Sequence, residues 1–551
     1  FYPIVANVLA RRGRIGDGVG GVMTQALAWW QSGVIYQVYP RSFMDSNADG
    51  VGDLAGITSR LDYVAWLGVD AIWISPIYPS PMKDFGYDVA DYRDIHPLFG
   101  NLDDLDALIA AAHGRGLRVL LDFVPNHTSD QHPWFVESRS SRENPKRDWY
   151  IWADPKPAGS PPNNWRSVFG GSAWTLDPPT GQYYYHAYLP EQPDLNWRSP
   201  AVREEMLDTL RFWLDRGVDG FRVDAVRQLR KDDRLRDNPP NPDWRPGDNP
   251  YDEVLPVYTT DRPETMEVVR EFRQVLDEYP DRLFVGELTL PIERLIRYYG
   301  AAAGEAIDLP SNFHMIYANW DASTLKALID RYEAALPVHA WPNWVLGNHD
   351  QHRIASRVGR PQARVAALLL LTLRGTPTLY YGDELGMIDV PAPPERIQDP
   401  FGRNVPGQER DPERTPMQWD SGPFAGFSTV EPWLPVAADA GTVNVEAQRD
   451  DPKSMLALYR RLLRLRRETP ALKVGAYVPW PADKRVLAFE RRLGDVRLLT
   501  VLNLGASPAP YALREVRGTV VLSATGTLDR QVVQGALRLG GDEGLLIRLE
   551  D

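Results

Sequence analysis

Residues 220–224 read Gly-Phe-Arg-Val-Asp, an apolar run typical of a buried strand that ends in a carboxylate. Two later runs have the same form: residues 283–287 read Leu-Phe-Val-Gly-Glu, and residues 346–350 read Leu-Gly-Asn-His-Asp. Carboxylates so far apart in sequence share a pocket only where the fold gathers the carboxyl ends of its strands, as a barrel of alternating strands and helices does. Two carboxylates in such a pocket can act on a glycosidic bond as nucleophile and as general acid and base.

The chain around these runs repeats a strand-then-helix pattern, with amphipathic helices expected at 54–67, 101–113 and 201–216. Apolar strands that alternate with helices indicate a parallel sheet buried on both faces. Eight strands are expected, at 34–39, 71–75, 118–123, 220–224, 283–287, 306–309, 344–347 and 378–381. The pattern predicts an α/β fold, a (β/α)8 TIM barrel built from residues 23–124 and 191–470 and closed by a helix at 453–468.

Three segments fall outside this pattern. Residues 125–190 are rich in Trp, Pro, Asn and Gly and contain a hairpin-like stretch at 175–188, which predicts a small domain inserted after the third strand. Residues 471–551 alternate short apolar runs with turns and are expected to form a C-terminal β-sandwich domain. Residues 1–22 are interpreted as an N-terminal extension or tag, because Met23 is a plausible natural start.

Composition excludes several classes of protein. The 551 residues are 43% hydrophobic and 25% charged, as in a globular protein, and the net charge of −13 argues against binding nucleic acid or an anionic membrane. Cysteine is absent, which leaves no disulfide or thiolate metal site. No apolar run approaches the roughly 20 residues that span a bilayer. At the N-terminus the apolar piece precedes the basic one, the reverse of a secretory signal. We expect a cytoplasmic enzyme, monomeric or a small homo-oligomer.

Four motifs in order carry a family resemblance. Residues 122–127 read Asp-Phe-Val-Pro-Asn-His, and residues 220–224, 285–287 and 348–350 follow with the three carboxylates. Together they resemble the conserved regions of the α-amylase family, glycoside hydrolase family 13. Within it, residues 84–88, 192–196 (Gln-Pro-Asp-Leu-Asn) and 414–419 (Arg-Thr-Pro-Met-Gln-Trp) are similar to the oligo-1,6-glucosidase and α-glucosidase group, most of all to bacterial α-glucosidases. The resemblance implies no organic cofactor.

The resemblance also implies roles for the carboxylates. Asp224 would be the nucleophile that forms a covalent glucosyl enzyme, and Glu287 the general acid and base. Asp350 would bind the sugar hydroxyls and stabilise the oxocarbenium-like transition state. Arg222 lies on the same side of its strand as Asp224 and is expected to keep that carboxylate ionised. Glu287 needs a raised pKa, and a retaining enzyme places the two carboxyl groups about 5 Å apart.

Further residues match the substrate-binding positions of this group. His127 and His349 would hydrogen-bond to the non-reducing glucose, and Tyr87 would stack on its ring. Asp84 and Arg410 would close the pocket beyond the 4-hydroxyl group and so impose exo action, although Arg414 is a nearby alternative to Arg410. The remaining pocket-shaping positions are Phe169, Gln192 and Tyr188, the last of which departs from the usual phenylalanine.

The linkage specificity depends on Ala225, the residue after the nucleophile. In similar enzymes a small residue at this position accompanies α-1,4 bonds and valine accompanies α-1,6 bonds. We therefore expect a retaining exo-α-glucosidase that acts on maltose and short malto-oligosaccharides, with transglycosylation as a side activity. The alternatives are an oligo-1,6-glucosidase and a sucrose or trehalose isomerase on the same scaffold. A non-catalytic relative of the transporter-chaperone type is disfavoured, because all three carboxylates are kept.

A metal site is expected in residues 45–53, where oxygen ligands alternate along the chain. The ligands would be Asp45, Asn47, Asp49, the carbonyl of Val51, and Asp53. Gly56 stands where an EF-hand has its bidentate glutamate, so the loop is not an EF-hand. It resembles the loop after the first barrel strand that holds a structural Ca²⁺ or Mg²⁺ in this enzyme group. Asn126 matches a ligand of a second calcium in true α-amylases, a site that we do not expect here.

Overall fold

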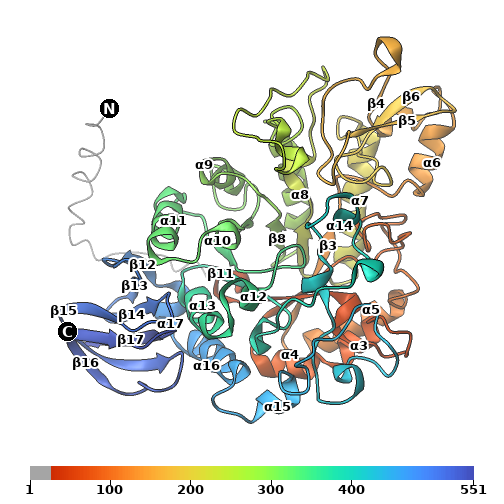
Figure 1. Ribbon diagram of the computed structural model, residues 1–551. Helices are drawn as coiled ribbons and strands as arrows, with labels where there is room; N and C mark the ends of the chain where they lie inside the picture. The colour runs from red at the N-terminus through yellow and green to blue at the C-terminus, as the bar shows by residue number, and fades with distance from the viewer. Residues whose placement is uncertain (1–26, 551) are drawn as a thin grey trace, which may run out of the picture.

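The computed structural model describes residues 27–550, so the expected extension 1–22 lies outside the described residues. Eight parallel strands close into a barrel, which confirms the predicted fold (Figure 1). In barrel order they are β1 (Ile35–Val38), β2 (Ala71–Ile74), β3 (Arg118–Phe123), β7 (Gly220–Val223), β8 (Leu283–Gly286), β9 (Leu309–Asn312), β10 (Asn343–Val345) and β11 (Thr376–Tyr380).

Helices cover the outside of this barrel. The main ones are α3 (Leu54–Ser59), α4 (Leu61–Leu67), α5 (Leu102–His113), α7 (Pro200–Asp215), α8 (Thr265–Asp277), α11 (Ala322–Ala335), α13 (Arg360–Thr372) and α16 (Met455–Glu468). Asn101 begins α5 by accepting hydrogen bonds from the first-turn amides, and Leu105, Leu108 and Ala112 bury one face at helical spacing. The single helix expected at 54–67 is two helices, because the backbone leaves helical geometry at Arg60.

Two barrel strands, β7 and β9, have local features that follow from their residues. Gly220 opens β7 opposite Leu283 of β8, and a Cβ atom added at this glycine would lie 2.2 Å from the Leu283 carbonyl oxygen. Only glycine therefore allows these two strands to pair closely. The strand expected at 306–309 is instead β9, three residues later; its Pro310, Ser311 and Asn312 hide it from a search for apolar runs.

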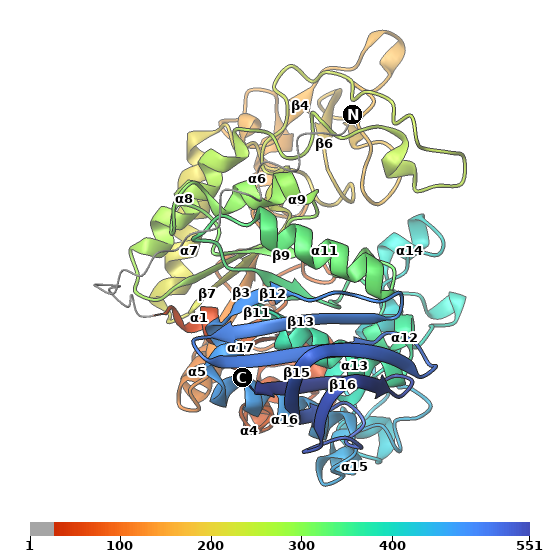
Figure 2. The ribbon, with the colours of Figure 1, turned by 90° about the vertical axis from the view of Figure 1, so that its left-hand side faces the viewer.

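The two additions lie on opposite sides of the barrel (Figures 1 and 2). Within residues 125–190 the structure has α6 (Pro133–Ser140) and an antiparallel sheet of β4 (Trp152–Ala153), β6 (Gln182–Tyr185) and β5 (Trp174–Asp177). The expected hairpin is the β5–β6 pair. None of the helices in residues 27–550 is long and apolar enough to cross a membrane.

The C-terminal β-domain is a single six-stranded antiparallel sheet, whereas two facing sheets were expected. Its order is β12 (Ala476–Pro479), β13 (Val486–Leu493), β14 (Val496–Asn503), β17 (Gly544–Glu550), β15 (Ala509–Ser523) and β16 (Val532–Leu539). The long strand β15 pairs with both β16 and β17, and this keeps the hydrogen bonding continuous. Register shifts in β15 allow the sheet to curve around a hydrophobic core of its own.

Candidate active site

The three carboxylates lie at the carboxyl ends of barrel strands. Asp224 directly follows β7, Glu287 directly follows β8, and Asp350 lies in the loop after β10. They line a common cavity of about 170 Å³, which is smaller than the roughly 300–1,000 Å³ of pockets for drug-sized ligands and so fits a small ligand. The other lining residues are Asp84, Tyr87, His127, Val168, Phe169, Tyr188, Arg227, His349, Gln351, Phe401 and Arg410.

Arg222 contacts both Asp224 and Glu287. Its Nη1 donates to Asp224 Oδ1 at 2.7 Å, and its Nη2 lies 3.1 Å from Glu287 Oε2. The same Nη1 also donates to Asp122 Oδ1 at 2.8 Å, a strand residue that the sequence analysis named only as part of a motif. The arginine side chain is 2% exposed. A single guanidinium in contact with both groups keeps them close together, as a retaining mechanism needs.

The electrostatics of Asp224 differ from expectation. Burial and the neighbouring Glu287 raise the pKa of Asp224 well above its usual range, although Arg222 acts in the opposite direction. Arg222 therefore does not by itself keep Asp224 ionised, because two carboxylates compete for one guanidinium in a buried place. Asp224 therefore takes up a proton more readily than an exposed aspartate, because the site is buried and the Glu287 carboxylate lies beside it.

Asp350 has a different environment. Arg410 Nη1 and Arg414 Nη2 both donate to its Oδ1, at 3.1 and 3.0 Å. Burial alone would raise the pKa of Asp350, but His349, Arg410 and Arg414 together hold it well below the usual range. This third carboxylate is thus held as an anion in the cavity that Asp224 and Glu287 also line.

The end of the cavity is closed by the pair Arg410 and Asp84, whose Nη2 and Oδ1 atoms are 2.8 Å apart. Arg410 is 8% exposed and is oriented by Asp399, which accepts from its Nη2 at 2.7 Å and from its backbone amide at 2.8 Å. Arg414 instead donates to the His349 carbonyl oxygen at 2.7 Å. The two arginines therefore have separate places, and Arg410 is the one beside Asp84. Asp399 had no recognisable sequence signal.

The two predicted histidines are buried and neutral. Burial lowers the pKa of His127 to about 4 and that of His349 to about 3. His349 lies parallel to the Tyr87 ring, with centroids 5.5 Å apart, and its Nε2 is 2.8 Å from the Tyr87 hydroxyl. Gln192 Nε2 lies 3.2 Å from His127 Nε2 and donates to Asp84 Oδ2 at 3.1 Å. Tyr87, His127, Gln192 and His349 thus present neutral polar groups, hydrogen-bonded to one another and to the Asp84 carboxylate, that suit sugar hydroxyls.

A second group of lining residues is aromatic. Phe169 stacks on Phe401 with ring centroids 4.9 Å apart, and the Arg410 guanidinium lies 5.0 Å from the Phe169 centroid. Tyr188 contacts both Phe169 and His127, at centroid distances of 5.5 and 5.2 Å. Phe401, like Val168, Arg227 and Gln351, was missed by sequence reasoning; it lies in α14 (Pro400–Asn404), a helix of five residues that is too short to show a periodic pattern.

Ala225 has a role beyond its size. It is 3% exposed and has left-handed backbone geometry, with φ 49° and ψ 32°. Its backbone amide donates to Glu287 Oε2 at 2.9 Å. A β-branched residue is strained in this conformation, so a larger side chain here would act on the backbone that holds Glu287 as well as on the available space.

The loop at 45–53 is wrapped around its own side-chain oxygens. Asp45 accepts from the amides of Asn47 and Gly50, at 3.0 and 2.9 Å, and Asn47 and Asp49 each accept from the amide two residues on. Asp53 begins α3 by accepting from the Gly56 amide at 2.6 Å. Asp45, Asp49 and Asp53 do not bring three ligand atoms within 4.8 Å of one another, although Asp and Asn oxygens are the donors that Ca²⁺ and Mg²⁺ prefer. The Val51 carbonyl lies within the same turn.

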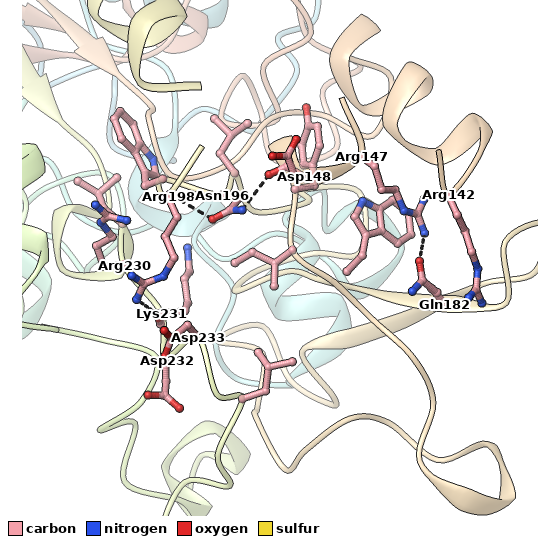
Figure 3. A pocket seen from close by; sticks show the side chains of 17 residues that line it. Arg142, Arg147, Asp148, Gln182, Asn196, Arg198, Arg230, Lys231, Asp232 and Asp233 are labelled. Carbon is pink, nitrogen blue, oxygen red and sulfur yellow. Dashed lines mark hydrogen bonds between the residues drawn. The ribbon is translucent and has the colours of Figure 1, made fainter. Parts of the chain in front are cut away.

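Two further features lie outside the group of residues that lines the candidate active site: a buried lysine and a second cavity. Lys231 Nζ donates to Asn126 Oδ1 at 2.8 Å and pairs with Asp194, so an ammonium group supplies the positive charge beside Asn126. A larger cavity of about 600 Å³ lies beside the inserted domain (Figure 3). Its lining includes Arg147 and Arg198 but none of the three carboxylates, so it is not the candidate active site.

Comparison with known proteins agrees with this geometry. Residues 37–475 match the alpha-amylase catalytic domain family. A probable alpha-glucosidase of Rhizobium meliloti (strain 1021) is 45% identical over 506 residues, covering 88% of this chain and 91% of the relative. The oligo-1,6-glucosidase of Parageobacillus thermoglucosidasius is 37% identical over 527 residues, covering 88% and 92%. The crystal structure of an alpha-glucosyl transfer enzyme matches with a TM-score of 0.90 at 42% identity, covering 95% of this chain and 100% of that one.

The fold and the relatives together define the chain as an enzyme of the glycoside hydrolase class. Within that class, it belongs to the alpha-amylase family, as its four motifs suggested.

Proposed function

We propose that this chain is a retaining exo-α-glucosidase that releases terminal α-1,4-linked glucose from maltose and short malto-oligosaccharides. The observation that carries the proposal is the small cavity in which Arg222 contacts Asp224 and Glu287 while the Arg410–Asp84 pair closes the far end. A closed end admits one terminal sugar and excludes the middle of a chain.

The residues divide the reaction between them. The Asp224 carboxylate attacks the anomeric carbon while the bond to the leaving oxygen breaks, and Glu287 transfers its proton to that oxygen. Glu287 then removes a proton from water, which displaces Asp224 and regenerates the pair. Glu287 thus acts first as acid and then as base, while Asp224 acts as nucleophile and then as leaving group. Asp350, held as an anion, stabilises the positive charge that develops on the sugar ring.

Ala225 supports the α-1,4 preference, and the likeness to an alpha-glucosyl transfer enzyme supports transglycosylation as a side activity. A hydroxyl group of a second sugar would replace water in the second step. The likeness to the Parageobacillus oligo-1,6-glucosidase supports the alternative function, cleavage of α-1,6 bonds, which is one outcome of the test below.

The test is glucose release from maltose, isomaltose, sucrose and trehalose at equal concentrations, with the products separated by chromatography. We expect maltose to be cleaved fastest and some trisaccharide to form. Faster release from isomaltose would overturn the linkage assignment, and isomerised disaccharide in place of glucose would assign the chain to the isomerase group. No turnover of any α-glucoside, with the fold intact, would contradict the proposal as a whole.

We further propose that the 45–53 loop binds a structural Ca²⁺ or Mg²⁺ through Asp45, Asn47, Asp49, the Val51 carbonyl and Asp53. The alternation of oxygen-bearing side chains along the loop supports this assignment. Treatment with a chelator should lower the melting temperature, and added Ca²⁺ or Mg²⁺ should restore it. A chelator-treated enzyme that melts at the original temperature would refute the site.

A further inference from the structure

A second cluster of potential metal ligands lies beside the active site. His352, Asp389 and Glu413 come from three different segments: the loop after β10, the chain after β11, and the turn that leads to Arg414. His352 Nδ1 is 2.9 Å from Asp389 Oδ2 and 3.8 Å from Glu413 Oε2. Across the described residues, this is the one set of three or more His, Asp or Glu whose ligand atoms all lie within 4.8 Å of one another.

The Glu413 carboxylate supplies an independent observation. Glu413 is 1% exposed, and its Oε2, the atom that faces His352, has no hydrogen-bond partner. A buried carboxylate oxygen without a partner is costly. The adjacent Arg414 does not supply that partner, because its guanidinium donates to Asp350 Oδ1 and the His349 carbonyl. The unpaired oxygen therefore faces His352 across 3.8 Å without a hydrogen-bond donor between them.

The geometry suits a small, four-coordinate cation. Tetrahedral zinc with bonds of about 2.0–2.2 Å holds its ligand atoms about 3.3 Å apart, and the observed 2.9 and 3.8 Å lie on either side of that value. Asp389 Oδ1 accepts from the Arg353 amide at 2.9 Å, which fixes the carboxylate and leaves Oδ2 for a metal. The His352 side chain is 60% exposed, so the site is open to solvent on one side for a water ligand.

We propose that His352, Asp389 and Glu413 bind a divalent transition-metal ion of the Zn²⁺ type. One imidazole nitrogen with two carboxylate oxygens favours such an ion over Ca²⁺ or Mg²⁺. This site is separate from the 45–53 loop, whose donors are oxygen atoms alone.

The bound ion would join two parts of the sugar pocket. His352 is two residues from Asp350, and Glu413 directly precedes Arg414, which binds Asp350. A metal between them ties the Asp350 loop to the turn that carries both pocket arginines. The ion is therefore a structural support for the transition-state carboxylate, at a position that touches neither Asp224 nor Glu287.

The test is titration of the metal-free full-length enzyme with Zn²⁺ by calorimetry, in excess Ca²⁺ so that oxygen-only sites are filled. We expect one Zn²⁺ per chain and a melting temperature raised by about 2 °C or more at saturation. Glu413→Gln and His352→Ala should each weaken Zn²⁺ binding by at least about 10–100-fold. The His352 variant changes an exposed side chain, so it reports on the metal even if Glu413→Gln folds poorly.

His113→Ala is the matched control. His113 also pairs with one aspartate, Asp219, at 2.7 Å, but it has no second carboxylate in a three-ligand set. This variant should bind Zn²⁺ as the wild type does. Absence of saturable Zn²⁺ binding in the wild type would overturn the proposal, as would Zn²⁺ binding that survives His352→Ala unchanged. The first result would mean that His352 and Asp389 form an ordinary ion pair beside a protonated Glu413.

Discussion

Replacing Arg222 with lysine tests the electrostatic core of the site. The guanidinium contacts Asp122, Asp224 and Glu287 at 2.8, 2.7 and 3.1 Å. A lysine ammonium is a single point charge without the planar fork, so it loses at least one of these buried charged contacts. A hydrogen bond to a charged group contributes about 1.5–3 kcal/mol. The expected loss in kcat/KM for Arg222→Lys is therefore about 10–150-fold.

The pH dependence of kcat/KM gives a second, independent test of the Arg222→Lys variant. Arg222 opposes the burial that raises the pKa of Asp224, so weakening its contact raises that pKa further. Since Asp224 must lose its proton before it can attack, the acid limb of the profile of kcat/KM against pH should move to higher pH. The assay is glucose release from maltose across the pH range, with thermal unfolding to check the fold.

The matched control is Arg216→Lys, at an exposed pair in which Arg216 contacts Asp106 at 2.7 Å. Exposed pairs contribute little, so its kcat/KM should stay within about twofold of wild type. A folded Arg222→Lys enzyme with wild-type kcat/KM and an unmoved acid limb would refute the reasoning.

Three further changes test other parts of the structure. Phe401→Ala removes part of the aromatic lining and should raise KM for maltose by about 5–30-fold with kcat nearly unchanged; a fall in kcat alone would show that Phe401 does more than bind. Ala225→Val strains a left-handed backbone position by about 1–3 kcal/mol and should reduce maltose turnover more than isomaltose turnover, whereas Ala225→Gly keeps the backbone; an unchanged ratio in the valine variant contradicts the linkage argument. Asp383 is buried and its pKa is raised to about 7, chiefly by burial, so its ionisation destabilises the fold as pH rises from about 4 to about 7. Asp383→Asn should therefore match wild type in stability near pH 4 and exceed it at pH 8, by up to about 4 kcal/mol; equal denaturant midpoints at both pH values would exclude this effect.

The barrel and the three carboxylates could be predicted because their signals are local. An apolar run that ends in a carboxylate marks a buried strand and its functional end within five residues, as at 220–224. The pocket wall at 399–414 carries no such period. Arg410 could be preferred to Arg414 only weakly from sequence, because the choice depends on Asp399, eleven residues earlier, which accepts from both the amide and the side chain of Arg410. Phe401, in the same segment 399–414, contacts Phe169, and no sequence pattern in either segment predicts that contact.

What the sequence could not show at all is how charge is distributed in the pocket. Arg222 lies among the carboxylates of Asp122, Asp224 and Glu287, and Arg410 lies among those of Asp84, Asp350 and Asp399. Arg414 adds a third guanidinium on Asp350, so these six acids face three arginines and the region stays net negative even when one of the acids is protonated. A neutral sugar gains little from such a field, but an oxocarbenium-like transition state gains much, because its positive charge develops where water is excluded. The arginines therefore serve to keep the acids in place at a tolerable cost, and the surplus of negative charge that they leave is what favours the transition state over the bound substrate.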